Sequence, residues 1–333
     1  MSSRPFIVAE LSANHLGGLE RALRLIDAAK QAGADAVKFQ TYRAAEMVGP
    51  PGYAIQDGPW AGRDLLSLYK EAETPRAWHQ ALFEYARSAG IEAFSTPFSR
   101  DDVDFLEEFD CPRYKIASFE LVDLPLIRYA ARTGKPLIMS TGMATREEIE
   151  NAVAEAARTC DDITLLKCTS AYPATVADAN LRTMIGMEEQ FGCRFGLSDH
   201  TQGIAVPVAA TVMGAAMIEK HLTLSRAEGG PDAAFSLEPA EFAIMVKACR
   251  ESADALGVVK YGPAPTEMPQ VGLRRSLYFS EDLEAGRMIR PTSVRTARPA
   301  LGLPPAMIDS VIGAQLARPV KAGEPVTADC LKG

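Results

Sequence analysis

Two histidines end two successive strand-like runs, which makes them the first candidates for chemistry. His200 follows residues 195–199 and His221 closes residues 217–221, in a chain with only four histidines. Backbones of neighbouring strands lie roughly 5 Å apart, so both imidazoles could reach one ion or one substrate oxygen. Two imidazoles without a third strong protein ligand leave coordination positions open, as in catalytic metal sites. We expect a divalent metal on this pair, with Glu10 nearby; the alternative is two neutral histidines that hydrogen-bond substrate directly.

The other two histidines have different surroundings. His79 lies in a helical pattern with Trp78 and Phe83, and we expect a structural role for it. His15 lies in the loop after the first strand-like run, where it could contact a ligand. Neither is expected to join the histidine pair.

Positive and hydroxyl side chains mark the ends of the other strand-like runs. Lys38 and Lys115 lie within apolar runs, where a charge without a partner is costly. The hydroxyl residues at the strand ends are Thr96, Ser118, Ser140, Ser170 and Ser198. Two lysines ringed by small donors suit a small anion that carries phosphate and carboxylate groups. The alternative is that the lysines only pair with carboxylates such as Glu10 and Glu120.

The lysines also raise a rival chemistry. Lys167 or Lys115 could form a Schiff base with a carbonyl substrate, as in a class I aldolase. Lys167 shares one strand face with Thr169, and Cys168 shares the other with Ser170, but alternation alone does not say which face points inward. Borohydride trapping with substrate would separate the two mechanisms.

These side chains can act together only in a fold that brings the strand ends close to one another, and the periodicity of the sequence predicts such a fold. Apolar runs alternate with helical patterns eight times in about 260 residues, the usual size of a (β/α)₈ TIM barrel, an α/β fold with its functional groups at the carboxyl ends of the strands. Strands are expected at residues 6–11, 36–40, 92–95, 114–117, 136–140, 163–168, 194–197 and 216–221. Helices are expected at residues 19–32, 74–90, 100–109, 125–133, 145–159, 181–191, 203–213 and 239–256, and an irregular loop through Trp60. A doubly wound open sheet is the alternative, but residues 12–18 lack its G-x-G-x-x-G turn.

The alternation of strand-like runs and helical patterns ends after residue 262. Three prolines fall between Pro263 and Pro269, which predicts a linker, and the remaining residues show short strand-like runs without a long helical pattern. We therefore expect a barrel domain at residues 1–262, a linker at 263–272 and a small β-rich domain at 273–333. A domain of this size has little core of its own, so we expect it to pack against the barrel or a partner subunit.

Composition excludes several classes of function. The formal net charge of −8 disfavours non-specific nucleic-acid binding, although local lysines could still bind an anionic small molecule. The six cysteines are scattered and form no C-x-x-C pair, which indicates reduced thiols and a cytoplasmic setting. We expect no membrane span, because no run of about 18 apolar residues occurs. We also expect no signal peptide, because the chain enters a strand pattern at once.

The strand-end motifs together resemble the sialic acid synthase (NeuB-like) family. The matching segments are residues 9–15, 37–41, 94–98, 114–118, 140–143, 168–173, 197–201 and 218–221. The tail resembles the family's C-terminal antifreeze-like (SAF) domain, so the likeness covers nearly the whole chain. Within the family, residues 229–239 look most like those of pseudaminic acid synthases. Lys167 and Ser170 also stand where neuraminate synthases often have histidine and asparagine.

The resemblance implies a metal-assisted transferase of carbohydrate biosynthesis. It would condense phosphoenolpyruvate with an acetamido sugar aldehyde, here 2,4-diacetamido-2,4,6-trideoxy-altrose. Carbon 3 of phosphoenolpyruvate attacks the aldehyde, water adds at carbon 2, and the tetrahedral intermediate loses phosphate by C–O cleavage. The catalytic residues would be Glu10, in proton transfer, and His200 and His221, holding Mn²⁺, Mg²⁺ or Co²⁺ that polarises the aldehyde. The residues implied to bind phosphoenolpyruvate are Lys38, Thr96, Lys115, Ser118, Ser140, Ser170 and Ser198. Those implied to contact the sugar are Gln40, Glu120, Tyr172, Asp232 and Arg298.

The resemblance also implies a domain-swapped homodimer in which the small domain inserts an arginine into the partner's site. Arg298 is the matching residue, and the alternative is a surface arginine in a turn. The implied partners are therefore the two substrates and a second copy of the chain, with no nucleic acid or membrane. The alternative functions are an N-acetylneuraminate or legionaminate synthase that uses another acetamido sugar and, more remotely, a Schiff-base aldolase or a non-catalytic sugar-binding protein.

Overall fold

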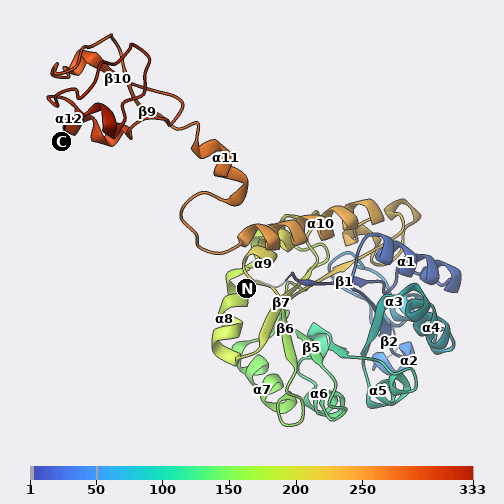
Figure 1. Ribbon diagram of the computed structural model, residues 1–333. Coiled ribbons are helices and arrows are strands. Elements are labelled where there is room, and N and C mark those ends of the chain that lie inside the picture. Colours follow the sequence, from blue (N-terminus) through green and yellow to red (C-terminus); the bar gives the residue numbers. More distant parts are fainter. Residues whose placement is uncertain (1–3, 50–51, 333) are drawn as a thin grey trace. The chain divides into compact units, whose positions relative to one another are not determined.

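The structure is a computed structural model that describes residues 4–49 and 52–332 (Figure 1). It divides into two compact units between Gly257 and Val258. Residues 1–3, which entered the expectation that no signal peptide is present, lie outside the described residues. Among the residues described, no helix is long and apolar enough to cross a lipid bilayer.

Eight parallel strands close into a barrel in chain order (Figure 1). They are β1 (Phe6–Glu10), β2 (Ala36–Thr41), β3 (Glu92–Pro97), β4 (Tyr114–Ile116), β5 (Leu137–Ser140), β6 (Ile163–Cys168), β7 (Arg194–Asp199) and β8 (Met217–His221). The last strand returns to pair with the first, so the sheet has no open edge. The strands read as nearly continuous apolar runs because both faces of the wall are buried. The predicted TIM barrel is confirmed.

Helices follow the strands and cover the outside of the barrel (Figure 1). In this unit they are α1 (Leu19–Gln31), α2 (Ala44–Met47), α3 (Leu65–Ala72), α4 (His79–Ala89), α5 (Arg100–Glu107), α6 (Leu124–Ala131), α7 (Arg146–Ala156), α8 (Arg182–Phe191), α9 (Ala205–Val212) and α10 (Pro239–Leu256). The bounds of α10 match the prediction, and most others differ by one to three residues. The helix expected from residue 74 begins as a short 3₁₀ turn, Arg76–Trp78, before α4.

Local signals explain where several helices begin and end. Ser99 precedes α5 and accepts a hydrogen bond from the backbone N–H of Asp102. Thr145 and Glu148 form a capping box at the start of α7. Gly90 ends α4 with φ of 68°, a left-handed conformation that favours glycine. The caps at Ser99 and Thr145 fix the points at which the chain leaves the loops at the barrel mouth, and Gly90 ends α4 at the opposite end of the barrel, just before β3.

The segment between β2 and α4 is more ordered than the sequence suggests. We expected an irregular loop through Trp60, but the described part contains α2, α3 and an isolated β-bridge between Ala54 and Asp64. Asp64 also caps α3 by accepting a hydrogen bond from the N–H of Ser67. The two helices are too short to show a clear helical period, which is why the pattern does not reveal them.

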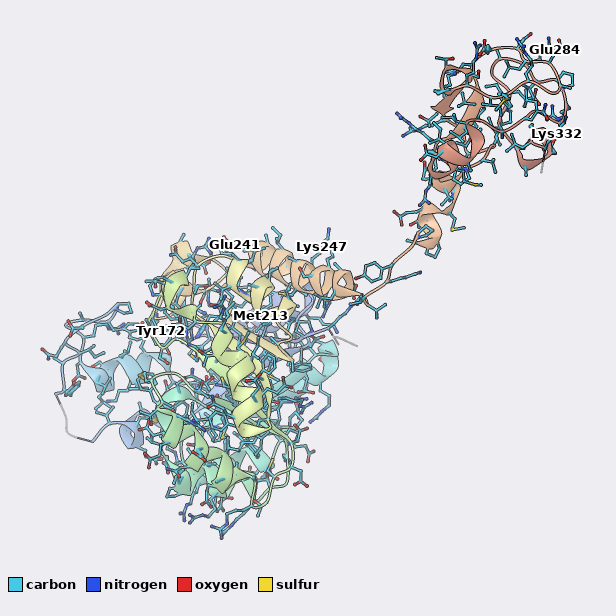
Figure 2. The ribbon with its side chains drawn as sticks, turned by 90° about the vertical axis from the view of Figure 1, so that its left-hand side faces the viewer. Tyr172, Met213, Glu241, Lys247, Glu284 and Lys332 are labelled. Atoms are coloured by element: carbon cyan, nitrogen blue, oxygen red, sulfur yellow. The ribbon has the colours of Figure 1, made fainter. Side chains whose placement is uncertain are left out.

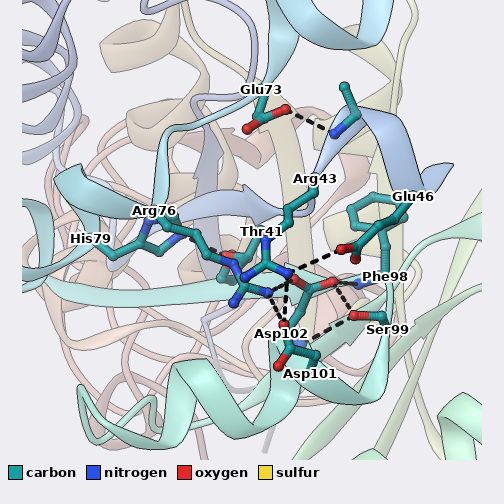
Figure 3. A network of polar contacts seen from close by, with 12 residues as sticks. Thr41, Arg43, Glu46, Glu73, Arg76, His79, Phe98, Ser99, Asp101 and Asp102 are labelled. Carbon is teal, nitrogen blue, oxygen red and sulfur yellow. Dashed lines mark hydrogen bonds and ion pairs between the residues drawn. The ribbon is translucent and has the colours of Figure 1, made fainter. Parts of the chain in front are cut away.

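Ion pairs fasten both ends of this segment to the first turn of α5 (Figure 3). Arg76 lies 2.7 Å from Asp101 and 2.6 Å from Asp102, and Arg43 lies 3.4 Å from Asp101. Glu73 accepts a hydrogen bond of 2.8 Å from the backbone N–H at the start of α2. The segment is therefore held at its base, and its middle part is free to form a wall of the barrel mouth.

The second unit is small and rich in turns. It contains the antiparallel strands β9 (Ser276–Phe279) and β10 (Val294–Ala297) and the short helices α11 (Met268–Val271) and α12 (Ile308–Val311). Its own core includes Leu277, Phe279 and Leu316. A small β-rich C-terminal domain was predicted and is confirmed, whereas the linker at residues 263–272 and the exact domain limits stay predictions.

Candidate active site

The carboxyl ends of the barrel strands open into a cavity of about 660 Å³. Side chains alternate along a strand, and the strand residues that line the cavity directly are Gln40 on β2 and His221 on β8. On β8, Glu219 and His221 share the inward face, while Lys220 between them points toward the helices. Tyr172, in the loop after β6 (Figure 2), lines the cavity as well.

Two lysines and two carboxylates form the floor of the site. Lys38 pairs with Glu10, and Glu219 Oε1 lies 3.7 Å from Lys38 Nζ and 3.8 Å from Lys115 Nζ. Burial disfavours the charge on Lys38, but Glu10 and Glu219 outweigh it and raise its pKa. Burial lowers the pKa of Lys115, and Glu219 offsets this only in part. The floor therefore combines a firmly charged ammonium with one that gains from an added anion.

The predicted alternative was that the lysines pair with carboxylates such as Glu10 and Glu120, and of these two the structure supports Glu10 only. Lys38 does pair with Glu10, as that alternative requires. Glu120, its second proposed carboxylate, makes no ion pair with either lysine among the described residues. Lys115 pairs with Glu219 at 3.8 Å and also donates a hydrogen bond of 2.7 Å to Ser140, so its ammonium keeps donors that could face a ligand.

The predicted hydroxyl residues gather around the two lysines. Lys38 donates to Thr96 at 3.2 Å, and Ser198 donates to Glu219 at 3.0 Å. Ser118 accepts a hydrogen bond of 3.1 Å from the backbone N–H of Gly142. A Cβ atom at Gly142 would lie 2.8 Å from Ser118 Oγ and would overlap Ser170 Oγ. The hydroxyls of Ser118 and Ser170, from the loops after β4 and β6, thus crowd around Gly142.

The histidine pair lies beside this floor, at the ends of β7 and β8, where His221 is the register partner of Glu10. The ring centroids of His200 and His221 are 5.3 Å apart, and the residues are only 5% and 8% exposed. His200 Nδ1 lies 3.0 Å from the carbonyl oxygen of Thr169, which can only accept, so Nδ1 carries a proton. Burial disfavours a second proton on His200, but its contacts with Cys168 and Thr169 outweigh this and raise its pKa. Burial lowers the pKa of His221 well below its usual value, which makes its imidazole neutral. His221 is thus a buried neutral imidazole with a free lone pair, the kind of donor that divalent metals prefer, and a bound cation would take the place of the second proton on His200.

The donors therefore fit a catalytic metal with two protein ligands. His221 Nδ1 has no hydrogen-bond partner and lies 3.5 Å from Asp232 Oδ2. The described ranges contain no cluster of three or more histidine, cysteine, aspartate or glutamate side chains that could hold a metal. The hydrogen bond from His200 to Thr169 is the outer contact that commonly orients a metal-binding imidazole.

A polar chain links the first loop to the histidines. Gln40 donates to Ser12 at 2.9 Å, and Ser12 donates to Asp232 at 3.2 Å. Burial and the charge of Glu10 raise the pKa of Asp232 to about 7. Burial also raises the pKa of Glu120, another lining residue, to about 7. These groups offer donors and acceptors to a hydroxylated ligand.

The outer wall of the cavity is aromatic. Trp60 lies 5.2 Å from Tyr172 and 6.3 Å from Phe235, measured between ring centroids, and its indole N–H donates to the carbonyl of Pro231 at 2.9 Å. Tyr172 in turn lies 4.4 Å from His200. The long segment after β2 thus closes over the site through Trp60.

Three other predicted residues of the barrel unit are not among those that line the cavity. Lys167 is on the outer strand face, where it donates to the carbonyl of Cys168 at 2.9 Å and to Thr169 at 3.1 Å, so it does not face the site. His79 is fully buried against phenylalanine rings, in agreement with a structural role. His15 contacts the carbonyl of Ala72 at 3.3 Å and is not among the lining residues. Arg298 is exposed in the bend after β10, in the second unit, and its role stays a prediction.

Sequence reasoning missed three residues of the site. Glu219 stands two residues before His221, and the period of two along a strand could have placed it on the same face. Ser12 and Trp60 come from loops, where no periodicity indicates direction. Both are identified only by their contacts with Asp232 and Pro231.

Comparison with known proteins gives matches over almost the whole chain. The NeuB family matches residues 25–261, and the SAF domain matches residues 274–332. A pseudaminic acid synthase of Helicobacter pylori is 43% identical over 99% of this chain and 98% of its own length. An N,N'-diacetyllegionaminic acid synthase of Legionella pneumophila is 37% identical over 96% of this chain and 92% of its own length. The crystal structure of a sialic acid synthetase from Leptospira borgpetersenii superposes with a TM-score of 0.73 at 34% identity, covering 81% of this chain and 91% of that one.

Proposed function

Because the chain belongs to the NeuB family, we propose that it is a pseudaminic acid synthase, which condenses phosphoenolpyruvate with 2,4-diacetamido-2,4,6-trideoxy-altrose. The observation that carries this is the 43% identity to a pseudaminic acid synthase over nearly the full length of both chains. The family predicted from the strand-end motifs is confirmed. Legionaminic acid synthases are the second candidate, since one of them is 37% identical over a similar length.

The lysine floor is the proposed site of phosphoenolpyruvate. Lys38 and Lys115 supply positive charge, and Thr96, Ser118, Ser140, Ser170 and Ser198 supply small donors around it. The backbone approach at Gly142, where no side chain fits, supports this location. Charge-assisted hydrogen bonds of this kind hold phosphate and carboxylate groups firmly in a buried site.

The sugar is proposed to lie toward the aromatic wall. Gln40, Glu120, Tyr172 and Asp232 all line the cavity and would contact its hydroxyl and acetamido groups. Trp60 and Tyr172 would cover its apolar face and exclude water. His200 and His221 would hold a divalent metal, which when bound polarises the aldehyde oxygen.

Each of the buried charged residues then has its own proposed role in the reaction. Lys38 and Lys115 would orient carbon 3 of phosphoenolpyruvate toward the aldehyde and stabilise the negative charge of the phosphate that leaves. Glu10, paired with Lys38 and buried, is positioned to accept the proton of the water that adds at carbon 2. C–O cleavage then releases inorganic phosphate and leaves the nine-carbon keto acid.

The test is phosphate release from phosphoenolpyruvate in the presence of a panel of acetamido sugars. We expect the largest kcat/KM with the 2,4-diacetamido-2,4,6-trideoxy-altrose substrate. A clear preference for the legionaminate precursor or for N-acetylmannosamine would support the corresponding synthase. No phosphate release with any sugar would contradict the proposal.

The assembly and compartment are also proposals. We infer a domain-swapped homodimer in which Arg298 enters the partner's site, since this arginine is exposed and lies in the SAF unit. We infer a cytoplasmic enzyme, because all six cysteines are free thiols, as expected in a reducing compartment.

A further inference from the structure

A buried ion pair lies behind the two histidines, on the face of the barrel wall that meets the helices. Lys220 Nζ is 2.5 Å from Asp199 Oδ2 and 2.5 Å from the carbonyl oxygen of Thr201. The side chains of Lys220 and Asp199 are 0% and 2% exposed. This layer of an α/β barrel is normally filled by apolar side chains, so a pair of full charges there calls for an explanation.

Packing does not require these charges. Moving two ions out of water costs several kcal/mol for each, and apolar residues of similar volume often replace a buried pair without loss of stability. The charges instead fix the relative positions of the groups that they contact, because hydrogen bonds and ion pairs constrain geometry more tightly than apolar contacts do. The pair is therefore better explained by an effect on the position of the residues around it.

The pair fixes the backbone on which His200 stands. Asp199 Oδ1 accepts the N–H of Thr201 at 3.1 Å, and Oδ2 accepts its hydroxyl at 3.1 Å. Lys220 accounts for the carbonyl of Thr201. The pair thus binds all three polar groups of Thr201. His200 lies between Asp199 and Thr201 in the chain, so its backbone is held on both sides.

The pair also joins the two strands at the position of the histidines. Asp199 and Lys220 are direct partners in the register of β7 and β8, and each immediately precedes one histidine. Other segments bind the backbone carbonyl groups of both histidines. The N–H of Ala174 donates to the carbonyl of His200 at 3.0 Å, and the N–H of Leu237 donates to that of His221 at 2.9 Å. The ion pair therefore adds a side-chain link between β7 and β8 directly beside the two histidines.

We propose that the Asp199–Lys220 pair is a positioning element that sets the spacing of the His200 and His221 imidazoles and so determines the affinity of the site for a divalent cation. The inference rests on the proposed function, which assigns the cation to these imidazoles. Neither Asp199 nor Lys220 touches the cation or the substrates. Their effect acts through the backbones that carry the two histidines.

The test uses the full-length protein with Mn²⁺ as the probe. In the single variants Asp199→Asn and Lys220→Met one buried charge remains without its partner, and we expect thermal unfolding roughly 10 °C below the parent. In the double variant no lone charge remains, and most of this loss is expected to be recovered. Mn²⁺ affinity, measured by electron paramagnetic resonance titration, is nevertheless expected to fall roughly 10- to 100-fold in the double variant.

A matched control is the Arg76–Asp102 pair, 2.6 Å apart, at the base of the segment after β2 (Figure 3). The double variant Arg76→Met, Asp102→Asn removes this partly buried pair, away from the histidines, and is expected to bind Mn²⁺ as the parent does. As a second variant of the site, Asp199→Glu keeps both charges but moves the carboxylate by one methylene, and Mn²⁺ affinity is expected to fall about tenfold.

Folded Asp199→Asn, Lys220→Met or Asp199→Glu protein that binds Mn²⁺ as tightly as the parent would overturn the inference, and so would a parent that binds no Mn²⁺. These titrations need no sugar and no turnover. A parent that binds Mn²⁺ but releases no phosphate would contradict the proposed function while leaving the positioning role intact, so the two failures are distinguishable.

Discussion

Glu10 on β1 and Lys38 on β2 stand directly opposite each other in the strand register and form an ion pair inside the barrel mouth. Their side chains are 1% and 4% exposed. Glu10 also accepts the backbone N–H of Ser12 at 3.0 Å, which fixes one of its oxygens. A carboxylate held in this way keeps a single orientation, as a proton acceptor in catalysis requires.

Glu10→Gln is therefore expected to reduce kcat sharply. The amide keeps the shape of the side chain but cannot accept a proton, and loss of general base catalysis typically costs roughly 100- to 10,000-fold. Phosphate release at saturating substrates measures the effect. Glu92→Gln, which alters an ion pair with Arg113 at the opposite end of the barrel, is the control and is expected to keep parental kcat. Equal activity of the two variants would rule out a catalytic role for Glu10.

Gly142→Ala is expected to weaken phosphoenolpyruvate binding. The added Cβ would overlap Ser170 Oγ and press on Ser118 Oγ at 2.8 Å, which displaces two of the proposed donors. We expect a rise in the KM for phosphoenolpyruvate of roughly tenfold or more. Gly186→Ala is a matched control within α8, where the nearest atom to a new Cβ is 3.7 Å away, and it should be neutral or slightly stabilising. An unchanged KM in Gly142→Ala would place the anion elsewhere.

The pH dependence of sugar binding is expected to follow Glu120. Burial raises its pKa to about 7, so the carboxylate becomes protonated as the pH falls through neutrality. If the ionised form accepts hydrogen bonds from the sugar, the KM for the sugar rises below pH 7, approaching tenfold for each pH unit well below that value. Glu120→Gln should raise the KM at pH 8 and reduce this pH dependence to the part that Asp232, whose pKa is also raised to about 7, contributes. The same pH profile in the variant would assign the titration to another group.

The same group predicts an effect on stability with a definite sign. The folded-state pKa of about 7 lies above the ordinary value of 4.5, so the contribution of Glu120 is fully present below about pH 4.5 and is lost as the pH rises through about 7. Glu120→Gln should therefore raise the melting temperature relative to the parent at pH 8 but not at pH 5. Because Glu120 is partly exposed, the gain is expected to be on the order of 1 kcal/mol.

Removal of divalent metal is expected to abolish activity. His200 and His221 offer two buried imidazoles 5.3 Å apart, and without a cation the aldehyde oxygen lacks its proposed electrophile. Treatment with a chelator should stop phosphate release, and added Mn²⁺ should restore it. His221→Ala should stay folded, as circular dichroism can show, but should not be rescued by Mn²⁺. Full activity of a chelator-treated His221→Ala enzyme would refute the metal role.

The fold and the strand-end residues could be predicted because both follow from periodicity. Strands buried on both faces give apolar runs, and polar groups at their carboxyl ends must meet at one mouth once the barrel closes. This reasoning located Lys38, Lys115 and the two histidines. It did not show that Lys167 points outward, since the inward face of β6 is decided only by closure of the whole sheet.

The remaining parts of the site depend on contacts between segments distant in sequence. Trp60 reaches Pro231 across 171 positions of the chain, and Ser12 reaches Asp232 across 220. No local pattern encodes such pairs, because they depend on how two loops fold over the mouth. The Asp199–Lys220 pair is hidden for a related reason: two charged residues within strands resemble surface positions until the helices above them are placed.

The inserted arginine gives the sharpest test of the proposed dimer. Arg298→Ala should raise the KM for the sugar, whereas Arg295→Ala, an exposed arginine on β10 of the same unit, should not. If Arg298 acts in the partner's site, refolding Arg298→Ala chains with an equal amount of His221→Ala chains should restore activity. A mixed dimer then has one barrel with intact histidines that receives an intact arginine, and random pairing predicts about a quarter of parental activity. If the arginine served its own barrel, every barrel in the mixture would lack one of the two groups, and activity would not rise above that of the separate variants.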